Sequence, residues 1–120
     1  MILLKKVITL TFLIFWFTNL NAQSSCADMI DMVESESYGT TYYSYDSDAI
    51  SQVTFHEVTD DSYNTYYFAI VKFKSSYNEY IYQVSSSTKS NYSMNYRQSE
   101  GEAFWQYIQP YNDNLNCAPN

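Results

Sequence analysis

The sequence has 120 residues, which suffices for one domain and no more. Six Lys and Arg against thirteen Asp and Glu give a net charge of −7, which disfavours a nucleic acid or another polyanion as the partner. One histidine and two cysteines far apart in the chain do not form a metal-ligand set, so we expect neither a metal ion nor another cofactor.

The first 22 residues have the three parts of a cleavable secretory signal peptide: two lysines near the start, an apolar stretch over Val7–Phe17 and the small residue Ala22 at the end. The apolar stretch is shorter than the roughly 18 residues that a membrane span needs. We therefore expect cleavage after Ala22 and export to the periplasm or the extracellular medium, without stable membrane insertion of the remaining chain. The alternative is a lipoprotein cut before Cys26, although no apolar residue stands three positions ahead of that cysteine.

The expected mature chain, residues 23–120, forms a single domain of 120 − 22 = 98 residues. Two of the six basic residues leave with the signal peptide, so its charge is 4 − 13 = −9. Both cysteines remain, and an even number of cysteines in an oxidising compartment indicates a disulfide. A Cys26–Cys117 bond would close nearly the whole domain and contribute about 4 to 5 kcal/mol in chain-entropy models. A redox or metal pair is the alternative, but such a pair needs cysteines close in sequence with further ligands nearby.

The first predicted element of the mature chain is a short helix that ends near Glu36. Ser25–Asp28 fits a capping box, in which the serine oxygen and a carboxylate bind the free amides of a helix start. Apolar residues then recur at helical spacing as far as Val33. Gly39 follows the helix and can adopt the positive φ that a helix exit often needs.

Three or four strands are predicted next, because four runs rich in Thr, Tyr and other strand-forming residues are separated by polar turns. The turns are short, which implies that neighbouring strands are antiparallel. In the third run, apolar residues occur at both odd and even positions, so both faces of this strand are apolar. We therefore expect it in the middle of the sheet. The runs are Thr40–Tyr45, Ile50–Val58, Tyr66–Phe73 and Glu79–Val84.

The second run places Val53 and Phe55 on one face and His56 on the other. This alternation predicts a His56 side chain that faces solvent. Val58 falls out of phase and predicts either a bulge or the end of the strand.

Two helices complete the predicted fold. The first spans about Thr88–Gln98, after a run of serines that offers several N-cap residues. The second begins with the capping box Ser99–Glu102 and stops at Pro110, which cannot continue a helix. The polar tail from Tyr111 is tied back only by Cys117. The sequence therefore predicts an α+β fold, in which a three- to four-stranded antiparallel sheet is covered by two C-terminal helices, with a short N-terminal helix.

Tyrosine is the unusual component of the sequence, with fourteen residues, all of them after the signal peptide. A tyrosine ring is apolar and carries a hydroxyl that needs a partner, so most of these residues can fill a thin core. An exposed row could instead stack on sugar rings or on a protein partner, since tyrosine is common at binding surfaces. The candidates for such binding are Tyr42, Tyr43, Tyr45, Tyr80 and Tyr82.

Groups suited to catalysis or metal binding are sparse. A hydrolase would need His56 within hydrogen-bond reach of a serine such as Ser51 or Ser75, with a third group to orient the ring. Two acidic pairs could bind calcium, but neither has the full loop of oxygen donors and glycine, and turn acids in contact with solvent are the more common explanation. These pairs are Asp46/Asp48 and Asp60/Asp61.

Three groups of residues from the third and fourth strands onward form a pattern: Tyr80-Ile81-Tyr82 with Val84, then Ser99-Glu100-Gly101, and last Phe104, Ile108 and Tyr111. The pattern, within residues 50–111, resembles the KTSC domain, a short module at the C-terminus of some lysyl-tRNA synthetases and a free-standing bacterial protein. The sequence has Ser85 where the family usually has proline and Gln109 where it often has arginine. The resemblance implies the fold. RNA binding has been suggested for the family, but an acidic exported domain is poorly suited to it.

We therefore expect an exported, non-enzymatic interaction domain whose partner is a protein or a glycan. RNA binding and a small hydrolase that uses His56 are the alternatives. An exposed aromatic patch of several hundred Å² would favour the interaction domain.

Overall fold

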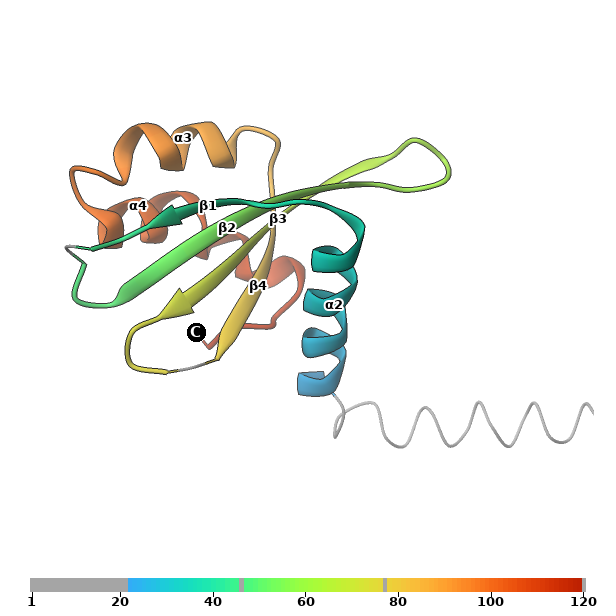
Figure 1. The fold of residues 1–120 in the computed structure, drawn as a ribbon, viewed down its shortest axis with the longest axis horizontal. Helices are drawn as coiled ribbons and strands as arrows, with labels where there is room; N and C mark the ends of the chain where they lie inside the picture. Colours follow the sequence, from blue (N-terminus) through green and yellow to red (C-terminus); the bar gives the residue numbers. More distant parts are fainter. Residues whose placement is uncertain (1–21, 46, 77, 120) are drawn as a thin grey trace, which may run out of the picture.

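The computed structural model describes residues 22–45, 47–76 and 78–119. Apart from Ala22, the predicted signal peptide lies outside these residues, as does Asp46 of the first acidic pair. The described chain forms one sheet with helices packed against it (Figure 1). No helix in these ranges combines the length and the hydropathy that a membrane crossing requires.

The secondary-structure elements follow the predicted order. The helices are α2 (Ala22–Glu36), α3 (Thr88–Asn95) and α4 (Glu100–Tyr107), and the 3-10 helix η1 (Gln109–Asn114) comes last. The strands are β1 (Thr40–Tyr43), β2 (Ile50–Thr59), β3 (Thr65–Phe73) and β4 (Glu79–Val84).

The four strands form one antiparallel sheet in the order β1-β2-β3-β4, as the short turns predicted. β3 lies between β2 and β4 and is buried from Phe68 to Val71, which confirms the prediction of a central strand. β2 and β3 are the longest strands, and the hairpin that joins them extends past the helices (Figure 1).

The two C-terminal helices cover one face of the sheet. Val53, Phe55 and Tyr82 project from the strands into a core that Tyr92 of α3 and Phe104 of α4 complete, and all five side chains are buried. This arrangement confirms the predicted α+β fold.

α2 covers the opposite face, where the sequence predicted solvent. Val33 of α2 packs against Phe68, Ile70 and Ile81, and these four residues form a second, smaller core. Successive residues of a strand point to opposite faces, so β3 contributes to both cores. Both faces of the sheet are therefore covered in part.

The connection from α2 to β1 differs from the prediction in two ways. α2 ends at Glu36 as predicted but begins at Ala22, so Ser25 lies inside the helix and is not its N-cap. Gly39 does not have a positive φ. It provides space instead, because a Cβ at Gly39 would lie 2.3 Å from Cγ2 of Thr54 and 2.8 Å from the ring of His56. The chain that leaves α2 therefore passes directly over β2.

Of the two alternatives predicted at Val58, the bulge is wrong and the strand end is correct to within one residue. Val58 pairs with Tyr66, and β2 continues to Thr59. The register shift in β2 lies instead between Ile50 and Gln52. Val58 falls out of phase with the α3–α4 face because it packs against the core under α2.

The C-terminal helices begin where the sequence predicted. α3 ends at Asn95, three residues earlier than predicted, and a turn follows it. The hydroxyl of Ser99 caps α4 by accepting a hydrogen bond from the N–H of Glu102. α4 ends at Tyr107, and Pro110 lies in the first turn of η1, where its missing N–H costs no hydrogen bond.

The C-terminal tail is more firmly attached than predicted. The side chain of Asn114 donates to the carbonyl of Gln83 on β4 at 2.8 Å, and the side chain of Asn112 donates to the carbonyl of Ala118 at 2.9 Å. The predicted disulfide joins Cys26 and Cys117. The tail therefore lies along β4 and is fastened to α2.

Candidate functional site

The five tyrosines predicted to bind a partner differ in exposure. Tyr43 is 53% exposed and Tyr45 is 84% exposed, and their rings stack with centres 6.2 Å apart. Tyr42 and Tyr80 are half-buried against the core under α3 and α4, and Tyr82 is 2% exposed. Of the five, Tyr43 and Tyr45 offer open ring faces.

A groove with aromatic walls lies between the end of β3, the start of β4 and α4. It holds about 320 Å³, and most of its surface is apolar. We call it the aromatic groove. Its walls are formed by Phe73, Tyr80, Tyr82, Phe104 and Trp105.

The rings of the aromatic groove support one another. Phe104 packs edge-on against Phe73 and Tyr82, with ring centres 5.4 Å and 5.7 Å apart. Trp105 packs edge-on against Phe104 at 5.6 Å, and Phe73 lies 5.7 Å from Tyr80. Such tilted contacts are the favoured arrangement of aromatic pairs. The groove is therefore held open by packed side chains in the free protein.

One rim of the aromatic groove is formed by α4. Trp105 is 62% exposed, whereas its neighbour Phe104 is buried in the core. Gly101, one turn earlier, leaves room beside the tryptophan, since a Cβ there would meet no atom within 4 Å. At the floor, burial raises the pKa of Tyr82 to about 12.

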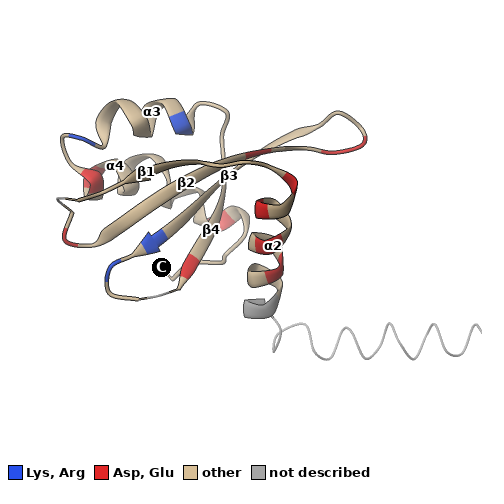
Figure 2. Ribbon diagram, viewed as in Figure 1, with Lys and Arg blue, Asp and Glu red and all other residues tan. Residues whose placement is uncertain are grey.

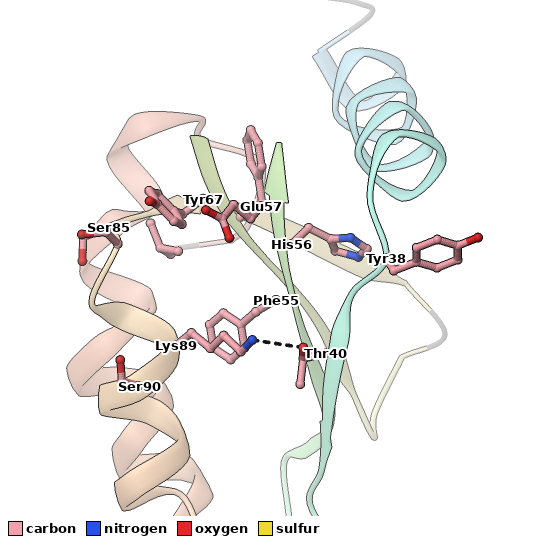
Figure 3. Close-up of a pocket in the computed structure, with 12 residues that line it drawn as sticks. Tyr38, Thr40, Phe55, His56, Glu57, Tyr67, Ser85, Lys89 and Ser90 are labelled. Atoms are coloured by element: carbon pink, nitrogen blue, oxygen red, sulfur yellow. Dashed lines mark hydrogen bonds between the residues drawn. The ribbon is translucent and has the colours of Figure 1, made fainter. Parts of the chain in front are cut away.

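A second pocket, more polar than the groove, lies at the edge of β2 and holds about 200 Å³ (Figure 3). Thr40, Phe55, Glu57 and Lys89 contribute to its lining, and Nζ of Lys89 donates to Oγ1 of Thr40 at 3.1 Å. We call it the edge pocket. A cation, a carboxylate and several hydroxyls suit a polar or charged side chain better than an apolar ring.

The solvent-facing position predicted for His56 is wrong. His56 is 7% exposed because the chain that leaves α2 crosses over it. Its Nδ1 lies 3.1 Å from Oγ of Ser37, its hydrogen-bond partner. Ser51 is five residues away along β2, at roughly 16 Å, and Ser75 follows β3 at its far end, where Phe73 pairs with Ile50.

This arrangement does not favour the hydrolase. Within the described residues, His56 has no carboxylate partner that would orient its ring as a general base. Its contact with Ser37 holds the crossing chain against β2.

The burial of His56 predicts a pH dependence of stability. Burial lowers the pKa of His56, and the contact with Ser37 opposes this only in part. The folded protein therefore binds fewer protons than the unfolded chain, and stability falls as the pH drops below about 6.5. We expect the melting temperature to fall by a few degrees between about pH 7.5 and about pH 5.5, and less so in His56→Gln. An equal fall in the variant, measured by circular dichroism, would contradict this role.

Charge is unevenly distributed over the protein. Acidic residues are frequent on α2 and on the β2–β3 hairpin, whereas Lys72 and Lys74 lie at the opposite end of β3 (Figure 2). Burial and the nearby carboxylate of Glu79 raise the pKa of Glu34 on α2. Lys74 already makes a hydrogen bond within the protein, because its Nζ donates to the carbonyl oxygen of Ser47.

Asp60, from the second acidic pair, stabilises its own turn. The N–H groups of Ser62 and Asn64 both donate to Oδ1 of Asp60 at 2.9 Å, and the bond from Asn64 contributes most to lowering the Asp60 pKa. The hydroxyl of Tyr66 donates to the other carboxylate oxygen. No cluster of three or more His, Cys, Asp and Glu suited to a metal ion occurs in the ranges that the structure covers.

No family model, curated protein or solved structure matches the chain. The function is therefore inferred from the residues of the protein itself. Phe104 belongs to the sequence pattern described above, whereas Trp105 was not among the residues predicted to bind a partner. The helical spacing carried a usable signal, because Ala103, Phe104 and Ile108 are buried on one side of the helix and the 3.6-residue period turns Trp105 away from that side.

Proposed function

We propose that the protein is an exported, non-enzymatic interaction domain that binds a partner protein by taking an apolar side chain into the aromatic groove. The observation that carries this proposal is the preformed groove beside Trp105, which is 62% exposed. Tryptophan and tyrosine are the residues that most often dominate binding energy at protein interfaces. A pocket that is already formed avoids the entropic cost of ordering side chains on binding.

The chemistry of the groove favours a protein over a glycan. A sugar ring carries several hydroxyls, and each one that is buried without a partner costs free energy. The polar groups of the lining are few, namely the amide of Gln109 and the hydroxyls of Tyr80 and Tyr82. A leucine, phenylalanine or methionine side chain needs none of them. The second open aromatic surface, formed by Tyr43 and Tyr45, could extend the contact with a protein.

RNA is disfavoured by the same lining. Among the described residues, none with a basic side chain lines the groove, and RNA recognition depends on cationic contacts to phosphate. The position where the KTSC family often has arginine is Gln109, which does line the groove. The relationship to that family, which we propose from the sequence pattern, directs attention to this surface, because Tyr80, Tyr82, Gly101 and Phe104 also line it.

The test is selection from a peptide library displayed on phage, followed by calorimetric titration of the selected peptides. We expect Trp105→Ala to weaken their binding at least tenfold, because it removes the exposed wall of the groove. Met94→Ala is the matched control, since Met94 is a large exposed side chain on α3 that does not line the groove. It should leave the affinity unchanged.

Two results would contradict the proposal. One is a set of selected peptides that bind Trp105→Ala and the unchanged protein equally well. The other is binding to a glycan array or to RNA at low salt, lost in Trp105→Ala, with no peptide selected.

A further inference from the structure

Part of the edge of β2 has no neighbouring strand. β1 pairs with Gln52–Phe55, whereas β2 runs on to Thr59. The chain that enters β1 crosses the face of β2 at His56 and does not extend the ladder. Within the described parts of the chain, no backbone hydrogen bond reaches Glu57 or Thr59 from this side.

The backbone groups of Glu57 and Thr59 point toward this open edge. Residues of an antiparallel strand turn their N–H and C=O groups alternately to one neighbour and the other. At one end of β2, Asp60 donates its N–H to Asn64 across the hairpin at 2.9 Å, and at the other Ser51 accepts from Ser44 on the β1 side at 3.0 Å. Both bonds indicate that the odd-numbered residues from 51 to 59 turn their backbone N–H and C=O groups toward the β1 side.

The edge pocket adjoins this open edge. Glu57 lines it, and so do Thr40, the first residue of β1, and Tyr38 of the chain that enters β1 (Figure 3). An extended segment placed beside Glu57 and Thr59 would continue the line of β1 and pass over the pocket. A volume of about 200 Å³ is enough for one side chain of that segment.

The negative charge around the open edge indicates which kind of segment can pair with it. Glu57, Asp60 and Asp61 lie on the hairpin, and Glu36 is the last residue of α2 (Figure 2). Lys89 lines the pocket, but its Nζ is bonded to Thr40. A second copy of the chain would bring the same carboxylates opposite these, and like charges across strands are destabilising. A basic segment would be attracted.

We propose that the edge of β2 at Glu57–Thr59 binds an extended lysine- or arginine-bearing segment of a partner protein as an added strand. Main-chain hydrogen bonds to two residues hold the segment, and the carboxylates select its charge. This site is distinct from the aromatic groove. It does not depend on what the groove binds.

The test uses two synthetic peptides of about eight residues, one alternating lysine with valine and the other glutamate with valine. Titration into the isotope-labelled protein, followed by NMR, should shift the amide signals of Glu57 and Thr59 with the lysine peptide only. Binding should weaken as salt is added, because these charges are exposed. Glu57→Pro should weaken it at least tenfold, since proline removes an edge donor without breaking the ladder to β3.

Two matched variants make the outcome decisive. Glu57→Gln keeps the N–H and removes the charge, so it should bind more weakly than the unchanged protein but more tightly than Glu57→Pro. Trp105→Ala should bind the lysine peptide normally, which separates this site from the groove. The proposal is overturned if the lysine peptide does not bind, if its shifts map to the groove or to β1, or if Glu57→Pro binds it with full affinity.

Discussion

Replacing Cys26 and Cys117 by serine is expected to lower the free energy of unfolding by about 4 to 5 kcal/mol, because the bond closes a loop of 91 residues. For a domain of this size the melting temperature should fall by roughly 20 °C or more. Thermal unfolding followed by circular dichroism, with and without a reducing agent, measures the effect. The crosslink joins α2 to the tail that lies along β4, and both segments pack against the second core. We therefore expect these two segments to detach first when the bond is removed.

The single variant Cys26→Ser is the control for this result. It should be as unstable as the double variant, because either change opens the same loop. A reducing agent should destabilise the unchanged protein and leave both variants unaffected. A loss of less than about 1 kcal/mol in the double variant would contradict the structural role of the bond.

Replacing Phe104 by alanine is expected to cost about 3 to 5 kcal/mol. Phe104 is buried where α4 meets the sheet, and its ring contacts Phe73, Tyr82 and Trp105. Removal of the ring leaves a cavity at the centre of these contacts and withdraws support from the wall of the groove. Urea unfolding at equilibrium gives the change in free energy.

The variant Phe104→Leu distinguishes the effect of lost side-chain volume from the effect of the lost aromatic ring. Leucine fills much of the same space, so we expect this variant to lose about 1 kcal/mol. If Phe104→Ala were as stable as Phe104→Leu, the ring would not be the centre of the core that α4 forms with the sheet.

The fold could be predicted from the sequence because its signals are local. Short polar turns specify antiparallel neighbours, and the Ser99 hydroxyl that caps α4 needs only a residue three positions away. The position of α2 could not be predicted in this way. Its face of the sheet mixes the polar His56 with Val58 and Phe68, and it is covered only because Val33, far away in sequence, packs there.

The candidate site could be predicted only in part. Tyr80 and Tyr82 do line the aromatic groove, as its wall and its floor. The exposed ring of the groove belongs to Trp105, which was not predicted. The groove depends on contacts between residues of β3, β4 and α4, and no spacing in the sequence encodes these contacts. Burial of His56 is similar, because it depends on Gly39 letting the chain cross closely above it.

The most direct test of the binding groove is acrylamide quenching of Trp105, the tryptophan that remains after the predicted signal cleavage. The free protein should be readily quenched, since this side chain is 62% exposed. With a library-selected peptide bound, we predict quenching close to that of a buried indole. Unchanged quenching at saturating peptide would show that the peptide binds elsewhere. This result would contradict the proposal that the aromatic groove is the binding site.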